Sequence, residues 1–243
     1  MRHQPRRFRI SALLTVACCC GALLVTAVHA ALVYDLSADW TAGNNPSGAW
    51  TYGAYGSGGS GGTLDPSTFT RFTAESTTLV PGLDIWWFGG DPNIEKNLTG
   101  SDILAYDIDW VSGQVAFGPQ FGPTVARWTA PASGLYDIAV TYMTIQKVNS
   151  PPSAYVYVGL TEVFDQALTA VSGAQFGTPA SYAASNVLLA AGQTVDFVVF
   201  GDNRLLNKTT EVDATITLVP EPALAGLLAL GGLLLAGRRL PRR

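Results

Sequence analysis

Histidine and cysteine are nearly missing from this 243-residue chain. The two histidines are His3 and His29, and the three cysteines are consecutive at 18–20, so all of them lie in the first 30 residues. If that segment is removed as a leader, the mature chain contains neither residue type. This excludes a cysteine nucleophile, a Ser-His-Asp triad, a zinc site built from histidine and cysteine, and any disulfide. Catalysis would depend on aspartate and glutamate alone.

Charge is also scarce, and it is unevenly distributed. Charged residues make up 13% of the chain, about half the usual share. Eight of the 14 basic residues lie in 1–30 and 238–243, so between Ala31 and Leu218 six basic residues face 17 acidic ones, a net charge of −11. Such a surface repels a phosphate backbone, which argues against nucleic acid as a partner.

The N-terminus has the pattern of a secretory signal peptide. Four arginines precede an apolar stretch from Ile10 to about Val28, and Val28 and Ala30 supply small residues at the −3 and −1 positions of a cleavage site. We therefore expect a signal-peptide helix over 1–30 and a mature chain that begins near Ala31. An uncleaved membrane anchor is the alternative, because the apolar stretch could just span a bilayer.

The C-terminal segment 219–243 contains three features in order. A VPEP sequence is followed by an apolar run of 15 residues, 223–237, and then by a basic tail. The run measures about 22 Å as a helix, short of a hydrocarbon core of about 30 Å. A buried core helix is the alternative, but such a helix should carry a polar stripe. The residues of the motif and tail are Val219, Pro220, Glu221, Pro222, Arg238, Arg239, Arg242 and Arg243.

This arrangement resembles the PEP-CTERM sorting signal of Gram-negative bacteria. In that family a membrane protease-transpeptidase, exosortase, recognises the motif, the apolar helix and the arginine cluster together. The resemblance implies export through the inner membrane and transient anchoring by the C-terminal helix. It then implies processing near the motif and release to the cell surface or the extracellular matrix. The family is associated with exopolysaccharide and biofilm.

The interior shows the period of two that is typical of half-buried antiparallel strands. It is clearest in 136–142, 193–200 and 211–218; in the second of these, Asp196 falls on the face opposite the apolar residues. Turn signals separate the strands, and Gly53–62 is a low-complexity loop. The other expected strands are 32–36, 50–55, 69–73, 83–88, 103–110, 113–117, 124–129, 154–160, 162–168 and 185–190.

Ten to thirteen short strands indicate one all-β domain over 31–218, an antiparallel β-sandwich. The strings VARWTAPASGLYDIAVTY (125–142), YVYVGLTEVFD (155–165) and AAGQTVDFVVFG (190–201) resemble a β-sandwich module of bacterial surface proteins. Those modules are jelly-roll folds similar to carbohydrate-binding modules. The resemblance implies a fold, and it implies a sugar ligand only as one alternative.

Tryptophan is plentiful, with six residues, and exposed aromatic rings can stack on sugars. Trp86 and Trp87 are neighbours on an expected strand, so one should face the core and the other should face outward. The outward ring is a candidate for glycan stacking. The alternative is that most of the tryptophans fill the core.

Scattered carboxylates raise two further possibilities. Calcium takes six to eight oxygen ligands, and Asp35 and Asp213 flank the first and last strands, which makes them our candidates for a structural calcium ion; no other cofactor is expected.

Two pairs at spacing i, i+2, Asp107 with Asp109 and Glu211 with Asp213, could share a strand face. A glycosidase needs two carboxylates across a substrate, so we expect no enzyme. The predicted function is that of a non-catalytic surface or matrix protein associated with exopolysaccharide; the alternatives are a module with a specific glycan ligand and a carboxylate-based glycan-active enzyme.

Overall fold

A computed structural model describes residues 31–56, 63–146, 151–169, 176–201 and 208–220. The chain from Ala31 to Val219 forms one compact unit. Every strand pair in the described residues is antiparallel. The expected all-β antiparallel sandwich is therefore confirmed, while the finer assignment as a jelly roll stays a prediction. The expected terminal helices lie outside the described residues.

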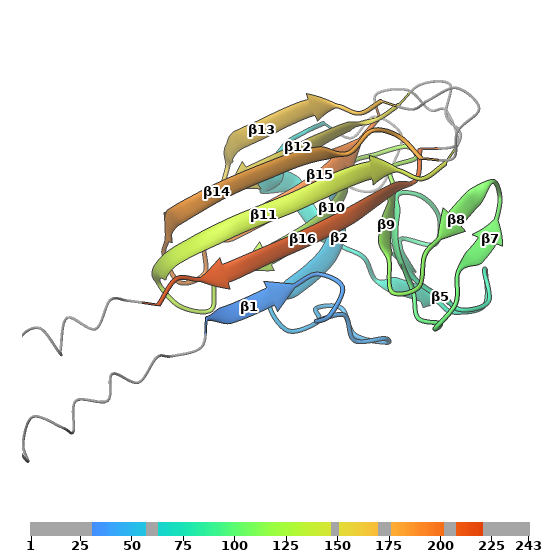
Figure 1. Cartoon of the computed structure of the whole chain (residues 1–243), viewed down its shortest axis with the longest axis horizontal. Helices are drawn as coiled ribbons and strands as arrows, with labels where there is room; N and C mark the ends of the chain where they lie inside the picture. The colour runs from blue at the N-terminus through green and yellow to red at the C-terminus, as the bar shows by residue number, and fades with distance from the viewer. Residues whose placement is uncertain (1–30, 57–62, 147–150, 170–175, 202–207, 221–243) are drawn as a thin grey trace, which may run out of the picture. The chain divides into compact units, whose positions relative to one another are not determined.

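The first sheet has eight strands in the order β14-β11-β16-β9-β6-β5-β4, and β1 also pairs with β16. Figure 1 shows β14, β11 and β16 side by side in one layer. The strands are β1 (Leu32–Asp35), β4 (Ala74–Ser76), β5 (Leu83–Trp87), β6 (Asn93–Asn97), β9 (Val115–Gly118), β11 (Gly134–Thr144), β14 (Ala180–Leu189) and β16 (Thr210–Leu218).

The second sheet has six strands in the order β13-β12-β15-β10-β2-β3. A separate hairpin, β7–β8, lies at one end of the sandwich (Figure 1). One short 3-10 helix, η1 (Pro66–Thr68), precedes β3. The strands are β2 (Trp50–Tyr55), β3 (Phe69–Arg71), β7 (Ile103–Ala105), β8 (Ile108–Trp110), β10 (Thr124–Thr129), β12 (Ser153–Val158), β13 (Thr161–Ala167) and β15 (Thr194–Phe200).

The main core lies between the two sheets and is rich in aromatic rings. Trp128 of the second sheet meets Tyr136 of the first edge to face, with ring centroids 5.1 Å apart. Trp50 packs against Phe197 with centroids 5.9 Å apart. The alternation predicted for 136–142 and 211–218 is confirmed up to residue 216, because every second residue from Tyr136 to Tyr142 and from Val212 to Ile216 is buried and the intervening ones are not; Leu218 is half-buried.

Asp196 lies on the face of β15 opposite Val195, Phe197 and Val199, as predicted, but this face is covered as well. Both faces of β15 are buried, and Asp196 is 0% exposed. Its carboxylate accepts two hydrogen bonds from Arg127, at 2.7 and 2.6 Å, and one from the hydroxyl of Tyr55 at 2.8 Å. The guanidinium of Arg127 also lies over the ring of Phe69 and donates to the carbonyl of Pro66. The segment around η1 therefore covers the outer face of the second sheet, which sequence periodicity does not reveal.

Two strands and a turn were not expected. β4 and β6 are additional strands, and the expected strand 103–110 is the β7–β8 hairpin, with Tyr106 and Asp107 at φ of 51° and 60° in its two-residue turn. Positive φ at both turn positions is the geometry that suits a tight hairpin. β6 escapes prediction because its sequence, NIEKN, lacks apolar alternation although it is an interior strand.

Polar side chains of β6 hold the hairpin against the outer face of the first sheet. Glu95 is 5% exposed and accepts a hydrogen bond from Trp110 Nε1 at 3.1 Å. Asn97 donates to the carbonyls of Trp110 and Ser101. Burial raises the pKa of Glu95 to about 8; the Trp110 hydrogen bond lowers the pKa and the charge of Asp91 raises it. The carboxyl of Glu95 is thus protonated in the folded chain at neutral pH.

We expect the stability of the fold to decrease from about pH 5 to pH 8. The unfolded Glu95 ionises near pH 4.5 and the folded one near pH 8, so between these values the unfolded state releases a proton that the folded state keeps. The free energy of unfolding falls by up to roughly 1.4 kcal/mol per pH unit in this window. Glu95→Gln, which keeps an acceptor for Trp110, should remove this contribution. Urea midpoints at pH 5, 7 and 9 check it, and parallel profiles for the two proteins would contradict it.

Candidate functional site

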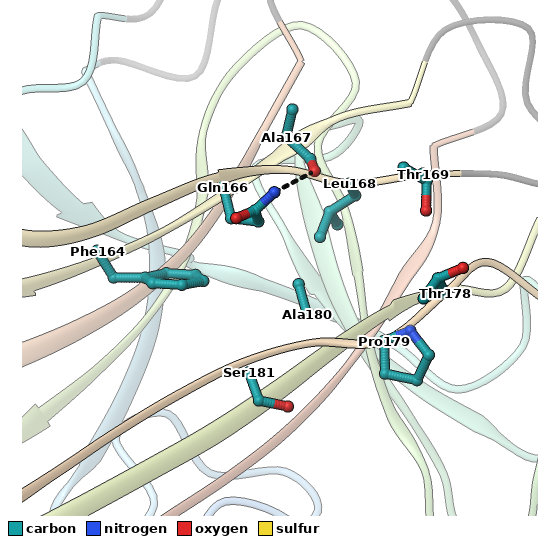
Figure 2. A pocket seen from close by; sticks show the side chains of 9 residues that line it. All are labelled: Phe164, Gln166, Ala167, Leu168, Thr169, Thr178, Pro179, Ala180 and Ser181. Carbon is teal, nitrogen blue, oxygen red and sulfur yellow. Dashed lines mark hydrogen bonds between the residues drawn. The ribbon is translucent and has the colours of Figure 1, made fainter.

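A pocket opens at the edge of the sandwich where β13 of the second sheet faces β14 of the first. Its volume is about 300 Å³, at the lower end of the range for ligand pockets. Figure 2 shows two facing rows of side chains, with Leu168 and Ala180 pointing into the space between them. The lining residues are Phe164, Gln166, Ala167, Leu168, Thr169, Thr178, Pro179, Ala180 and Ser181.

One aromatic ring, that of Phe164, lines this pocket, and two further rings pack against it. Phe164 on β13 stacks on Tyr142 of β11 with centroids 6.2 Å apart and an interplanar angle of 8°. It also meets Tyr182 of β14 at 5.6 Å. The hydroxyl of the buried Tyr142 donates to the carbonyl of Tyr155 on β12. These contacts join the two sheets, so the position of the half-buried Phe164 ring is fixed by both.

The polar lining is uncharged. Gln166, Thr169, Thr178 and Ser181 are exposed, and the only hydrogen bond drawn in Figure 2 runs from Gln166 Nε2 to the carbonyl of Ala167 at 3.2 Å. Hydroxyl and amide groups both donate and accept hydrogen bonds. The lining includes no aspartate, glutamate, lysine or arginine. The pocket can therefore hold an uncharged polyhydroxylated ligand, and it offers no acid or base for chemistry.

A second hollow, of about 450 Å³, lies near β1 and the adjoining ends of β2 and β10. Tyr34 contributes the aromatic ring, and this ring meets Trp128 at 5.2 Å. Prolines and alanines make up half of the lining, and the threonine hydroxyls number two. Its walls are thus poorer in hydrogen-bonding side chains than those of the pocket between β13 and β14. The lining residues are Tyr34, Pro46, Gly48, Ala49, Thr51, Thr129, Ala130 and Pro131.

The tryptophans mainly fill the core, as the alternative in the sequence analysis held. Five of the six are buried, and only Trp87 is half-exposed. Trp86 is 7% exposed and belongs to the main core, whereas Trp87 packs against the apolar cluster under the β7–β8 hairpin. The prediction that the two rings take opposite faces of β5 is confirmed. A buried Trp86 cannot stack on a sugar, so glycan stacking stays a prediction for Trp87 alone.

The structure does not gather the carboxylates that were expected to act together. Asp35 caps a turn by accepting from the backbone N–H groups of Ser37 and Ala38, and Asp213 is exposed on β16. Over the described ranges, no group of three or more Asp, Glu, His or Cys side chains could hold a metal ion. Calcium at Asp35 and Asp213 stays a prediction.

Of the two carboxylate pairs considered for catalysis, one shares a strand face and the other does not. Asp107 lies in the β7–β8 turn and not on a strand, so its expected sharing of a strand face with Asp109 is wrong. Glu211 and Asp213 do lie on one face of β16, because the residue between them is buried and they are not. Neither pair lines the two pockets described above.

Most of the predicted sorting residues lie outside the described part of the chain. Val219 is half-exposed and donates its N–H to the carbonyl of Leu135 at 2.8 Å, and Pro220 is exposed. Within the described ranges, no helical segment has the length and hydrophobicity that crossing a bilayer requires. The residues outside the description are Val28, Ala30, Glu221, Pro222, Arg238, Arg239, Arg242 and Arg243.

Sequence reasoning missed the pocket between β13 and β14. The strand 162–168 was expected, but its partner across the pocket was placed at 185–190, whereas β14 begins at Ala180. Residues 180, 182 and 184 alternate with the small residues Ser181, Ala183 and Ser185, and this pattern could have extended the predicted strand toward Ala180. No local pattern reports that edges of two different sheets meet there.

Comparison with known proteins gives no family. No protein-family model and no curated protein matches the chain. Among solved structures, the K1 cleaved adhesin domain of Lys-gingipain from Porphyromonas gingivalis W83 is 12% identical, with 79% of this chain and 99% of that chain covered and a TM-score of 0.40.

Two structures of carbohydrate-binding modules are also similar. The tandem CBM51 modules of Sp3GH98, the family 98 glycoside hydrolase from Streptococcus pneumoniae SP3-BS71, are 11% identical, with 79% and 49% coverage and a TM-score of 0.39. A family 35 carbohydrate binding module from Clostridium thermocellum is 16% identical, with 42% and 75% coverage and a TM-score of 0.28. Similarity at this level carries no argument about function, so the site has to be judged on its own geometry.

Gly177, the neighbour of the pocket residue Thr178, should be intolerant of a side chain because the backbone of Thr169 lies directly against it. A Cβ at this position would overlap the carbonyl oxygen of Thr169, and the Gly177 N–H donates to the carbonyl of Thr144 at 2.7 Å. We expect Gly177→Ala to destabilise the fold by about 1–3 kcal/mol. Gly100→Ala is the control, since nothing lies within 4 Å of its Cβ position, and it should change stability by less than about 0.5 kcal/mol. Thermal unfolding measures both, and equal effects would contradict the close contact.

Proposed function

We propose that this chain is an exported, non-catalytic protein that binds a neutral polysaccharide in the pocket between β13 and β14. The observation that carries the proposal is the lining: exposed hydroxyl and amide groups beside an aromatic ring, with no charged side chain. Sugars present both hydroxyl groups and apolar ring faces, which such a lining complements.

The charge of the domain favours a neutral ligand over an anionic one. The part of the chain between Ala31 and Leu218 has a net charge of −11, so an anionic polymer meets long-range repulsion before it reaches the pocket. The pocket itself contains no lysine or arginine that could offset this repulsion. A neutral polysaccharide does not meet this repulsion.

The affinity of a single pocket should be weak. A lining of four uncharged polar side chains and one half-buried ring gives few contacts, each contributing on the order of 1 kcal/mol. A dissociation constant of roughly 10 μM to 1 mM follows from this scale. Such affinity suits many copies displayed on one surface, where avidity multiplies it.

Export and sorting remain part of the proposal through the two chain ends. The signal-peptide pattern of 1–30 and the resemblance of 219–243 to a PEP-CTERM signal support export, transient membrane anchoring and processing by an exosortase. A surface or matrix location would place the pocket among extracellular polysaccharides. A purely structural matrix role, without a saturable ligand, is the second candidate, favoured by the small volume of the pocket between β13 and β14.

Binding is tested on an array of neutral and uronic-acid-containing polysaccharides with the purified full-length chain. We expect saturable binding to neutral glycans, which Gln166→Ala and Thr178→Val each weaken about five- to tenfold through loss of one hydrogen bond. Both side chains are exposed, so folding should be unaffected. Thr51→Val, in the second hollow, is the matched control and should bind like the unmodified chain. Binding that survives both pocket substitutions, or no saturable binding at all, would overturn the proposal.

Processing is tested separately in a host that contains an exosortase. Glu221→Ala should leave an unprocessed form in the membrane fraction, because the resemblance implies that the PEP motif is read by the enzyme. Asp165→Ala, an exposed acidic residue on β13, should be processed normally. Immunoblots of membrane and medium fractions give the result, and normal processing of the Glu221 variant would show the sorting proposal to be wrong.

A further inference from the structure

The pocket between β13 and β14 is the gap of a hairpin whose two strands separate. β13 and β14 follow each other in the chain, and Thr169 and Thr178, just beyond their adjoining ends, pair as an isolated antiparallel bridge. In the described residues the two strands do not otherwise pair with each other, since β13 pairs with β12 and β14 pairs with β11. The gap therefore begins at the bridge and runs between the strands toward Phe164 (Figure 2).

The bridge closes one end of the gap, and backbone contacts hold this end wall in place. The carbonyl oxygen of Thr169 lies so close to Gly177 that no Cβ fits between them. The Gly177 N–H donates to the carbonyl of Thr144, a buried residue of β11, at 2.7 Å. Because these contacts tie the bridge to the first sheet, a ligand cannot leave the pocket along the strands at this end.

Aromatic rings close the other end of the gap. Phe164 of β13 meets Tyr182 of β14 across it, with ring centroids 5.6 Å apart, and stacks on the buried Tyr142. Phe164 is a lining residue and Tyr182 is not, so Phe164 forms this end wall and Tyr182 supports it from outside the pocket. The two strands thus leave no continuous groove past Phe164.

The floor of the pocket is closed as well. Leu168 is 2% exposed and belongs to the main core. Its N–H donates to the carbonyl of Pro152 at 2.9 Å, which ties the floor to the start of β12. With two strands as side walls and two closed ends, the pocket opens in the described part of the chain on one side, where Gln166 and Ser181 of opposite walls are exposed.

We propose that this pocket takes the terminal unit of a neutral glycan chain and not an internal segment. The proposal rests on the function proposed above and narrows its ligand. A sugar unit inside a chain is linked on two sides, so it needs a groove that is open at both ends. A terminal unit is linked on one side and can enter a pocket that is closed at both ends. The volume of about 300 Å³, small for a ligand pocket, suits one or two sugar units.

The distribution of polar groups suits a chain end. A terminal unit has one more free hydroxyl group than an internal unit. Thr169 and Thr178, which form the closed end, supply two exposed hydroxyl groups there, and a hydroxyl group both donates and accepts hydrogen bonds. Phe164 at the opposite end offers an apolar face to the sugar ring. The rest of the glycan would leave through the exposed side, past Gln166.

The test measures affinity against chain length with the purified full-length chain. The neutral polysaccharide that binds on the array supplies a series of oligosaccharides from one to six units, and titration calorimetry gives the dissociation constant of each. Because one or two units enter the pocket, we expect the constants of the disaccharide and the hexasaccharide to agree within about threefold. An open groove would instead bind the hexasaccharide about tenfold or more tightly, since further units would add hydrogen bonds.

Tyr182→Ala opens one end of the pocket without removing a lining side chain. The terminal unit should still bind, while the hexasaccharide should gain about three- to tenfold over the disaccharide by extending past Phe164. Tyr106→Ala is the matched control, because this tyrosine is 71% exposed in the β7–β8 turn. Its profile should follow that of the unmodified chain. Equal profiles in the two variants would contradict the closed end at Phe164.

Reduction of the hexasaccharide with borohydride separates the two chain ends. It opens the sugar ring at the reducing end and leaves the non-reducing end intact, so loss of binding assigns the reducing end and unchanged binding assigns the other. A dissociation constant that falls about tenfold or more from disaccharide to hexasaccharide in the unmodified chain would overturn the terminal-unit proposal and leave glycan binding standing. Absence of saturable binding to the neutral glycans of the array would overturn the proposed function itself, and this narrower proposal with it.

Discussion

The packing of aromatic rings between the two sheets is the interaction on which the rest of this structure depends. Trp128 and Tyr136 come from opposite sheets and meet edge to face, and Trp50 packs on Phe197 in the same layer. Such rings bury a large apolar area and also prefer specific relative orientations. They therefore fix both the separation of the sheets and the register in which they face each other. Strands that contribute no ring to this layer are positioned by their pairing with the strands that do.

Both outer faces of the sandwich are partly covered, and polar contacts anchor the covers. On the second sheet, Arg127 pairs with the buried Asp196 and reaches the carbonyl of Pro66 next to β3. On the first sheet, Glu95 and Asn97 hold the β7–β8 hairpin. Buried polar groups of this kind add little net stability, but breaking one partner is costly. They therefore determine where the η1 segment and the β7–β8 hairpin lie on the two sheets.

The candidate sites lie where the sandwich is incomplete. Between β13 and β14 the sheet edges separate enough to leave a pocket that the ring of Phe164 lines. Edges and core margins are the places where a fold can present polar groups without losing its main apolar contacts, which is the reason that binding groups gather there.

The sequence by itself determined the fold class and most of the strands, because period-two alternation in segments such as 136–142 reports directly which face is buried. It also determined that histidine and cysteine chemistry is excluded from 31–243. Only the tertiary structure decided that Asp196 and Glu95 are buried, since their burial depends on η1 and the β7–β8 hairpin, which come from other parts of the chain. The same holds for the pocket beside Phe164. Such sites arise from pairings between distant segments, and a local pattern contains no information about which segments meet.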